Sequence, residues 1–86
     1  MLAGLADLEL LDLEDCGLTD AGVKHLESLD KLQNLTLKLN VGVTDAAVPS
    51  LIKLRDLKTL DVAQTTLSDA GLQQLRQALP NCQIVR

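Results

Sequence analysis

Three consecutive segments of the 86-residue chain share one apolar pattern, and this repetition constrains the fold more than any other feature. The segments begin at Leu8, Leu32 and Leu57, and an incomplete fourth begins at Cys82, which gives spacings of 24, 25 and 25 residues. Repetition at such a period is typical of proteins that stack similar structural units. One unit of this size cannot close a hydrophobic core, so neighbouring units must bury their apolar side chains together.

Each segment changes its apolar spacing partway along. Two apolar residues that are two positions apart place both side chains on one face of a β-strand. Three apolar residues at spacings of three or four follow them and form one stripe of a helix. The strand pairs are Leu11/Leu13, Leu35/Leu37 and Leu60/Val62, and the helical stripes are Val23/Leu26/Leu29, Val48/Leu51/Leu54 and Leu72/Leu75/Leu79. The sequence therefore predicts an α/β fold in which every unit is a short strand, a turn and a helix.

The apolar positions also follow a known consensus. The segment that begins at Leu8 reads LELLDLEDCGL and fits the pattern L-x-x-L-x-L-x-x-N/C-x-L at each defined position. The segment at Leu57 fits with Val for Leu and Thr for Asn, whereas the segment at Leu32 carries one extra residue before Val43. On these residues the chain resembles the leucine-rich repeat family. The Thr-Asp-Ala-Gly continuation at Thr19 is similar to a bacterial subtype and to the cysteine-containing repeats of F-box substrate receptors.

The resemblance implies a solenoid with a short parallel β-sheet on its concave side and helices on its convex side. It divides the chain into a partial repeat over 1–7, repeats over 8–31, 32–56 and 57–81, and a terminal partial strand over 82–86. Alternate strand residues then face outward in three columns. The first column holds Leu10, Asn34, Thr59 and Ile84, the second Asp12, Thr36, Asp61 and Arg86, and the third Glu14, Lys38 and Ala63.

The implied function is a non-catalytic protein–protein interaction module, the C-terminal part of a leucine-rich repeat protein that binds a protein partner on its concave face. The expected binding residues are Asp12, Glu14, Asn34, Thr36, Lys38, Thr59 and Asp61. The chain has no Trp, Tyr or Phe, the aromatic residues that dominate many interface hot spots. Two alternatives therefore stay open: a structural end-cap of a longer solenoid with no binding role of its own, and a substrate-receptor or assembly adaptor.

The net charge of −4 argues against two classes of partner. A nucleic-acid binder needs clustered Lys and Arg, and adhesion to anionic membranes also needs positive charge. The leucines form no run of roughly 20 apolar residues, which a membrane-spanning helix requires. The N-terminus has no basic segment followed by an apolar one, so this stretch is not a secretory signal, and a signal on a longer precursor stays open. These features leave the compartment open and favour the cytoplasm.

No residue pattern predicts an enzyme, a cofactor or a metal site. Cys16 and Cys82 are too few for a disulfide framework and show no Cys/His metal spacing, so they are expected to be buried free thiols. His25 is the single histidine and is expected to be exposed on a helix. Asp12 and Asp61 lie two strands apart, about 10 Å, which is too far to share a proton.

Several polar residues recur at equivalent positions and are expected to have structural roles. Hydroxyl–carboxylate pairs open each helical part, where the hydroxyl can cap the helix and the carboxylate faces its positive end. These pairs are Thr19-Asp20, Thr44-Asp45 and Ser68-Asp69. Cys16, Asn40 and Thr65 share the position just after the strand, where the turning backbone needs hydrogen-bond partners.

The second segment departs from its neighbours. Pro49 falls inside the expected helix, where it lacks a backbone N–H and disfavours helical geometry at the residue before it. We expect this helix to begin late, near Pro49, or to be a 3₁₀ segment.

The beginning of the chain aligns with the end of a helical part rather than with a strand. Leu2 to Leu8 matches Leu26 to Leu32, so the first unit is expected to lack a cap. Its open strand edge and apolar side chains would favour a longer parent protein or self-association. Leu10 and Ile84 are out of phase with the core and are expected on the sheet surface.

Overall fold

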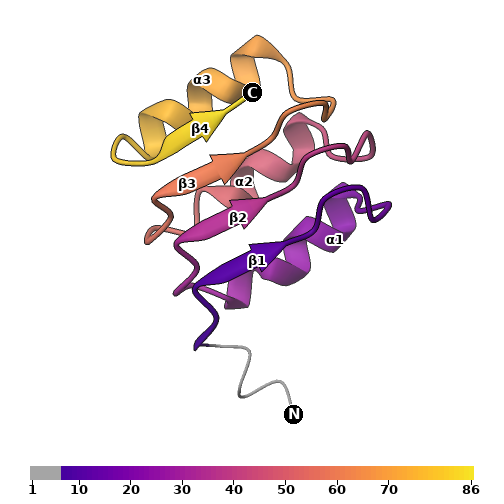
Figure 1. Ribbon diagram of the computed structural model, residues 1–86. Coiled ribbons are helices and arrows are strands. Elements are labelled where there is room, and N and C mark those ends of the chain that lie inside the picture. The colour runs from indigo at the N-terminus through magenta and orange to yellow at the C-terminus, as the bar shows by residue number, and fades with distance from the viewer. Residues whose placement is uncertain (1–6) are drawn as a thin grey trace.

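The computed structural model describes residues 7–86, which form one parallel β-sheet with short helices along one of its faces (Figure 1). The predicted partial repeat over 1–7 lies outside the described residues except for Asp7. The strands are β1 (Leu10–Asp12), β2 (Asn34–Thr36), β3 (Thr59–Asp61) and β4 (Gln83–Val85). The α-helices are α1 (Asp20–Lys24), α2 (Val48–Leu51) and α3 (Asp69–Ala78), and the 3₁₀ helices are η2 (His25–Ser28) and η3 (Asp45–Ala47). The predicted α/β class, with strands and helices alternating, is confirmed.

The four strands lie in chain order, and equivalent residues of successive units are neighbours in the sheet. Leu11 pairs with Leu35, Leu35 with Leu60, and Leu60 with Ile84. All pairings are parallel, because each strand is followed by a helix that returns the chain to the same end of the sheet. The predicted alignment of the first three strands is therefore confirmed.

The predicted alignment of the last strand is wrong by one residue. Gln83, not Ile84, pairs with Thr59, and Val85, not Arg86, pairs with Asp61. The turn after α3 is one residue shorter than expected: the N–H of Gln83 already donates to the Lys58 carbonyl at 2.8 Å. A one-residue shift reverses the face of every side chain. Ile84 consequently packs against the core, whereas Leu10 is 64% exposed on the sheet surface as predicted.

One apolar core fills the space between the sheet and the helices. The inward residues of the strands and the helical stripes meet there, and Leu35 and Leu60 are at most 1% exposed. The other buried apolar side chains belong to Val23, Leu32, Leu37, Val43, Ala47, Val48, Leu51, Leu54, Leu57, Val62, Leu67, Leu72, Leu75 and Leu79. Within residues 7–86, no helix has the length and apolar character that crossing a membrane requires.

The helices begin where the hydroxyl residues predict. Thr19 and Ser68 have extended backbones, and their hydroxyls accept the N–H of Gly22 at 3.4 Å and of Gly71 at 3.2 Å. Thr44 caps η3 by accepting the N–H of Ala46 at 3.2 Å. The three predicted caps are confirmed.

The second unit is irregular in the way that Pro49 predicts. A 3₁₀ turn, η3, precedes α2, and Pro49 occupies the first turn of α2, where its missing N–H costs no helical hydrogen bond. In the third unit no proline interrupts the apolar stripe, and α3 extends over ten residues. Pro49 thus accounts for the 3₁₀ turn that precedes the helix of the second unit.

Asn40 joins the turns of two units, as its place in the repeat predicts. Its side chain is 1% exposed; Nδ2 donates to the carbonyls of Leu13 and Leu37 at 2.8 and 2.9 Å. Its Oδ1 accepts the N–H groups of Cys16 and Leu18 at 3.1 and 3.0 Å. One buried amide therefore holds the first turn against the second.

The other two residues at that position hold only their own turns. The hydroxyl of Thr65 donates to the Val62 carbonyl at 2.7 Å, and the thiol of Cys16 donates to the Leu13 carbonyl at 3.0 Å. Cys16 is exposed, so its predicted burial is wrong. Asn40 is covered because the first unit lies beside it. Cys16 is exposed because no described strand lies on the other side of its own unit.

The chain turns off each of the first three strands through a residue with left-handed backbone geometry. Asp15, Leu39 and Gln64 have φ angles of 52°, 68° and 59°, and each lies four positions after the central leucine of its strand. This geometry costs an ordinary L-residue about 1–2 kcal/mol and an asparagine less. The residue types at this position, Asp, Leu and Gln, do not indicate the strain, because none of them is a glycine.

Gln64→Asn is expected to raise the free energy of unfolding by up to about 1 kcal/mol, because Gln64 is exposed and the change relieves backbone strain without uncovering the core. Urea unfolding followed by circular dichroism measures it. The matched control is Gln73→Asn on the exposed side of α3, which is expected to lower stability by a few tenths of a kcal/mol because asparagine is a poorer helix former. Equal effects at both positions would contradict the assignment of strain to Gln64.

Candidate protein-binding surface

The face of the sheet opposite the helices has no helix or strand of the described residues over it, and it carries all seven predicted binding residues (Figure 1). The strand pairing places them in rows that run across the sheet. The first row is Leu10, Asn34, Thr59 and Gln83, and the second is Asp12, Thr36, Asp61 and Val85. A third row follows the strands and holds Glu14, Lys38 and Ala63. The backbone hydrogen bonds between units continue there: the N–H of Asp15 donates to the Lys38 carbonyl at 2.9 Å, and the N–H of Leu39 donates to the Ala63 carbonyl at 3.0 Å.

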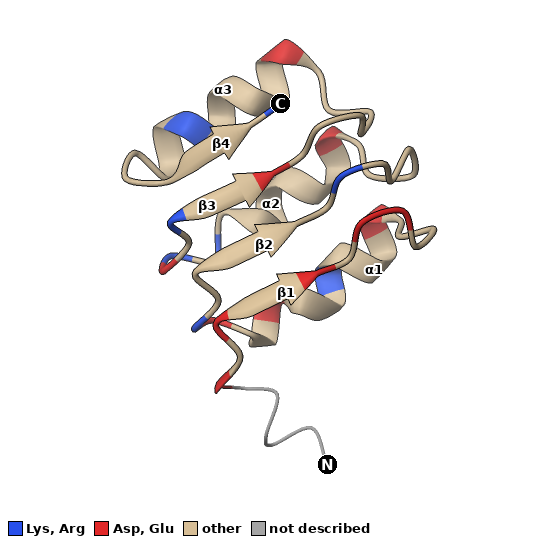
Figure 2. Ribbon diagram, in the orientation of Figure 1, with Lys and Arg blue, Asp and Glu red and all other residues tan. Residues whose placement is uncertain are grey.

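The rows mix both signs of charge. Acidic residues mark the ends of β1 and β3, and Lys38 lies after β2 between them (Figure 2). Each carboxylate is fixed by its own chain: Asp12 Oδ1 accepts the N–H of Glu14, and Asp61 Oδ1 accepts the N–H of Ala63, both at 3.0 Å. Because a carboxylate has two oxygens, each Asp keeps one oxygen for a ligand. Asp12 and Asp61 therefore have a structural role that sequence analysis missed.

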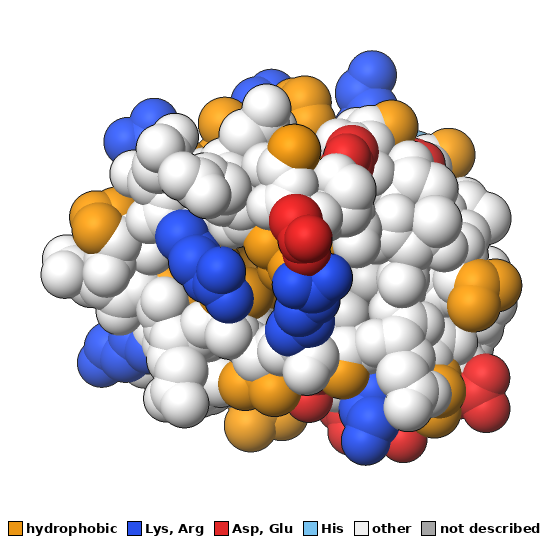
Figure 3. All heavy atoms as spheres, turned by 90° about the horizontal axis from the view of Figure 1, so that it is seen from above, with side chains coloured by type: hydrophobic (Ala, Val, Ile, Leu, Met, Phe, Trp, Pro, Cys, Tyr) orange, Lys and Arg blue, Asp and Glu red, His pale blue; other side chains and the backbone are white. Residues whose placement is uncertain are grey.

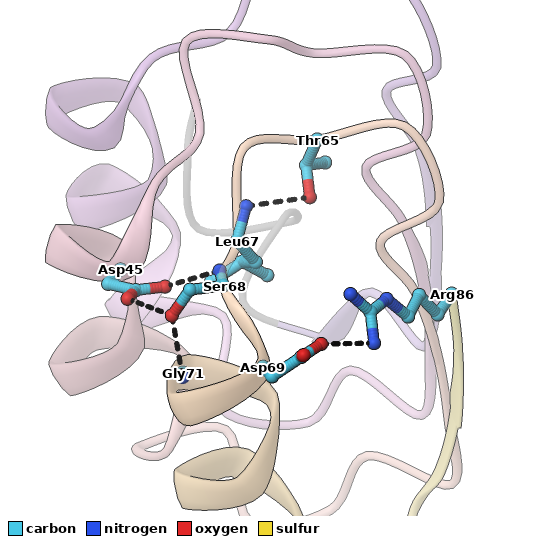
Figure 4. Close-up of polar contacts among 7 residues, drawn as sticks. All are labelled: Asp45, Thr65, Leu67, Ser68, Asp69, Gly71 and Arg86. Atoms are coloured by element: carbon cyan, nitrogen blue, oxygen red, sulfur yellow. Dashed lines mark hydrogen bonds and ion pairs between the residues drawn. The ribbon is translucent and has the colours of Figure 1, made fainter.

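In the first two units, the start of the helical part bonds to the start of the next unit's helical part through an aspartate. Asp20 accepts the N–H of Thr44 at 2.7 Å and its hydroxyl proton at 2.6 Å. Asp45 accepts the same two groups from Ser68, the N–H at 2.9 Å (Figure 4). Gly71 lies so close to Asp45 that a Cβ would overlap the carboxylate, which explains the glycine there.

The sequence alone predicts for these aspartates only a favourable interaction with the positive end of a helix. The spacing is the signal that could have predicted these bonds between units. A hydroxyl and a carboxylate recur together every 24 to 25 residues, and equivalent residues of successive units lie side by side. The third aspartate, Asp69, pairs with Arg86 beyond the last strand (Figure 4). Two aspartates thus link successive units, whereas the third forms an exposed ion pair with the residue after β4.

The Asp45 link is expected to make stability depend on acidity. The hydroxyl and the backbone N–H of Ser68 both hold the pKa of the Asp45 carboxyl below its usual value. A carboxyl whose pKa is lower in the folded state stabilises the fold above its unfolded pKa, near 4, and loses this effect as the pH falls through the folded pKa. Asp45→Asn is therefore expected to weaken the loss of stability below about pH 4.

Urea unfolding at a series of pH values from about 2 to 6 measures this dependence. Part of it is expected to persist in Asp45→Asn, because hydrogen bonds from Ser50 and Lys53 lower the pKa of Glu27 in the same direction. Asp56→Asn, which removes an exposed loop carboxylate, is the matched control. A pH profile of Asp45→Asn identical to that of the unchanged protein would contradict the Asp45–Ser68 link.

The helical side carries a shallow apolar groove of about 420 Å³ between α2 and α3. It exists because α2 is a single turn, so the second half of α3 has no helix beside it there. The groove is lined by Val48, Pro49, Ile52, Gln74, Gln77 and Ala78.

The reactive side chains are dispersed. His25 is exposed as predicted, and Cys82 is a half-buried free thiol whose pKa is raised by burial. Among residues 7–86, no three His, Cys, Asp or Glu side chains converge as a metal site would require.

A search with models of known protein families found none that matches this sequence.

Proposed function

We propose that the chain is a non-catalytic protein-interaction module of the leucine-rich repeat type, which binds a protein partner on the concave face of a short solenoid. The observation that carries the proposal is the uncovered face of the parallel sheet, where side chains of four successive strands stand in rows. Neighbouring strands lie about 4.8 Å apart, so each row offers a regular series of contacts along an extended partner.

The chemistry of the rows favours a polypeptide partner. Thr36, Asn34 and Thr59 can donate and accept hydrogen bonds, while Lys38 lies between acidic neighbours. A surface with both charges and many neutral polar groups matches the mixed character of protein surfaces. The net charge of −4 disfavours a polyphosphate backbone.

A photo-crosslinking residue at Thr36 tests the proposal in the organism's own lysate, and the same residue at Gln73 on α3 is the matched control. We expect a protein to crosslink from Thr36 and not from Gln73. Reversing two charges on the face, with Lys38→Glu and Asp61→Lys, is expected to abolish the crosslink while circular dichroism shows an intact fold. Capture that is equal from both positions, or that survives the reversal, would contradict binding at this face.

A structural end-cap is the second candidate, and the outer side of α3 favours it. Gln73 and Arg76 are exposed on α3, and the view onto this end shows polar side chains and backbone over most of the surface (Figure 3). A stack of repeat units requires such a polar terminal face. Absence of any crosslinked protein from Thr36 would favour this role.

A further inference from the structure

The sheet face carries charges of alternating sign on three successive strands. Asp12 and Asp61 lie in one row with Thr36 between them, and Lys38 lies two residues after Thr36, beside that row (Figure 2). None of the ion pairs formed within residues 7–86 includes Asp12, Lys38 or Asp61. These three charges therefore do not neutralise one another, and a ligand of complementary charge can pair with each of them.

The far end of the same row is apolar. Val85 pairs with Asp61 in the sheet and is 37% exposed on the face away from the helices. Removing its apolar surface from water would favour a partner that carries an apolar side chain at this end. The row thus reads acidic, small and polar, acidic, apolar across the four strands.

The spacing of the strands selects the conformation of the partner. Neighbouring strands lie about 4.8 Å apart, so Asp12 and Asp61 are separated by about 9.6 Å. Helix residues seven positions apart are separated by about 10.5 Å along the axis, which is close to this value. In a β-strand, side chains on one face are about 6.8 or 13.6 Å apart, and neither spacing matches. A helix that lies across the strands therefore fits the row, whereas a β-strand does not.

The width of a helix brings Lys38 into the same contact. Lys38 is displaced from Thr36 by two residues along the strand, or about 6.8 Å, and a helix with its side chains is about 10–12 Å wide. Positions i, i+4, i+7 and i+11 form one line along a helix, and position i+3 lies to the side of that line. In one of its two directions along the row, the helix therefore turns position i+3 towards Lys38.

We propose that the sheet face binds an amphipathic α-helix of a partner protein with Lys or Arg at positions i and i+7, Asp or Glu at i+3, a small residue at i+4 and an apolar residue at i+11. The two basic residues pair with Asp12 and Asp61, and the acidic residue pairs with Lys38. The small residue lies on Thr36, and the apolar residue covers Val85. This inference rests on the proposed function, since it names the kind of partner that the same face binds.

A further repeat unit at either end would extend this face without covering it. The strands follow one another in chain order, so a unit placed before β1 or after β4 would add a strand beside the sheet and lengthen the rows. Thr36 and Asp61 also lie on β2 and β3, each of which has a described strand on both sides.

A synthetic helix tests the proposal. Because an isolated helix of about 15 residues is marginal in water, the probe carries a hydrocarbon staple on the side turned away from the protein. It has Lys at i and i+7, Glu at i+3, Ala at i+4, Leu at i+11 and one tryptophan. The chain has no Trp, Tyr or Phe, so the fluorescence anisotropy of the probe reports binding without background. We expect saturable binding.

Two control peptides test the spacing and the conformation. Moving the second Lys from i+7 to i+5 places it on the opposite side of the helix and is expected to weaken binding at least about fivefold, since that charge can no longer reach the face. An unstapled version with a central proline cannot form the helix and is expected to bind at least as weakly. Equal binding by either control would overturn the proposal.

Charge substitutions in the protein locate the contact. Asp61→Asn keeps the oxygen that accepts the Ala63 N–H and removes only the charge. It is expected to weaken binding about threefold, whereas Asp56→Asn, in an exposed loop, changes it less than about 1.5-fold. Asp61→Lys is expected to abolish binding of the probe, and a probe with Glu at i+7 is expected to restore it. Equal effects of the two Asn variants, or absence of this rescue, would overturn the assigned pairing.

The remaining results separate this inference from the proposed function. A protein that crosslinks from Thr36 while the probe does not bind would overturn the helical partner alone. Probe binding without any crosslinked protein would contradict the proposed function and this inference with it. Mass spectrometry of the crosslinked peptides identifies both ends of each link. A crosslink from Thr36 to another stretch of the same protein, or to a second copy, would show that this stretch covers the face and would overturn the proposal.

Discussion

Asn40→Ala is expected to lower the free energy of unfolding by about 3 kcal/mol, the largest effect of any single polar substitution in this chain. The amide of Asn40 satisfies two carbonyls and two N–H groups, which belong to the turns of two different units. An alanine cannot replace any of these bonds, and each buried group left without a partner costs about 1–3 kcal/mol. Partial entry of water around the exposed Cys16 is expected to reduce the total.

Urea unfolding measured by far-ultraviolet circular dichroism tests this expectation. The matched control is Asn34→Ala, which removes an exposed asparagine from the sheet face and is expected to change stability by less than about 0.5 kcal/mol. Thr65→Ala, at the position equivalent to Asn40, is expected to cost about 1 kcal/mol because that hydroxyl bonds only within its own turn. A loss below about 1 kcal/mol for Asn40→Ala would contradict the role assigned to the amide.

Leu35→Ala is expected to destabilise the fold by about 3–4 kcal/mol, through lost burial and the cavity left behind. Leu35 is 1% exposed and lies between Leu11 and Leu60 in the sheet. Leu11→Ala removes the same atoms from the equivalent position of the first unit, where the side chain is only half-buried. It is expected to cost roughly half as much, since its apolar surface is already partly exposed to water.

The difference between these two leucines is measurable by the same urea titration. The side chain and its position in the strand are the same, but Leu35 has a described strand on both sides and Leu11 has one on a single side, so the difference reports how far each end of the core is covered. Equal losses for Leu11→Ala and Leu35→Ala would show that another part of the protein or a second copy covers the first unit.

Features that depend on local residue type could be predicted from the sequence. Thr19, Thr44 and Ser68 cap helices because a hydroxyl before a helix has few other roles, and Pro49 delays α2 by the geometry of its own ring. The pairing of Leu11, Leu35 and Leu60 could be predicted because a long repeat fixes which residues are equivalent.

Features that depend on the next unit could not be predicted in the same way. The last strand has only a few residues, so nothing downstream fixed its alignment, and the shorter turn after α3 moved Ile84 into the core. The burial of Cys16 was predicted from its consensus position, which assumes a neighbour on both sides. The bonds of Asp20 and Asp45 to the next cap require knowledge of which way each carboxylate points.

The candidate surface also has features that the sequence predicts and features that it does not. The sequence placed Asp12, Thr36 and Asp61 in one row of the sheet, and strand pairing confirms it. The backbone N–H bonds that occupy one oxygen of each aspartate depend on the bend of the chain after each strand, and no residue pattern revealed that bend. Whether these rows bind a protein is a proposal that the crosslinking experiment tests.

The proposed binding face depends on one arrangement, in which each unit of 24 or 25 residues lies beside the last and equivalent residues are neighbours. Methyl–methyl nuclear Overhauser effects from specifically labelled leucines measure it most directly. The account predicts contacts from Leu35 to both Leu11 and Leu60, and none between Leu11 and Leu60, which lie two strands apart. A spectrum in which Leu35 contacts neither, or in which Leu11 contacts Leu60, would contradict it.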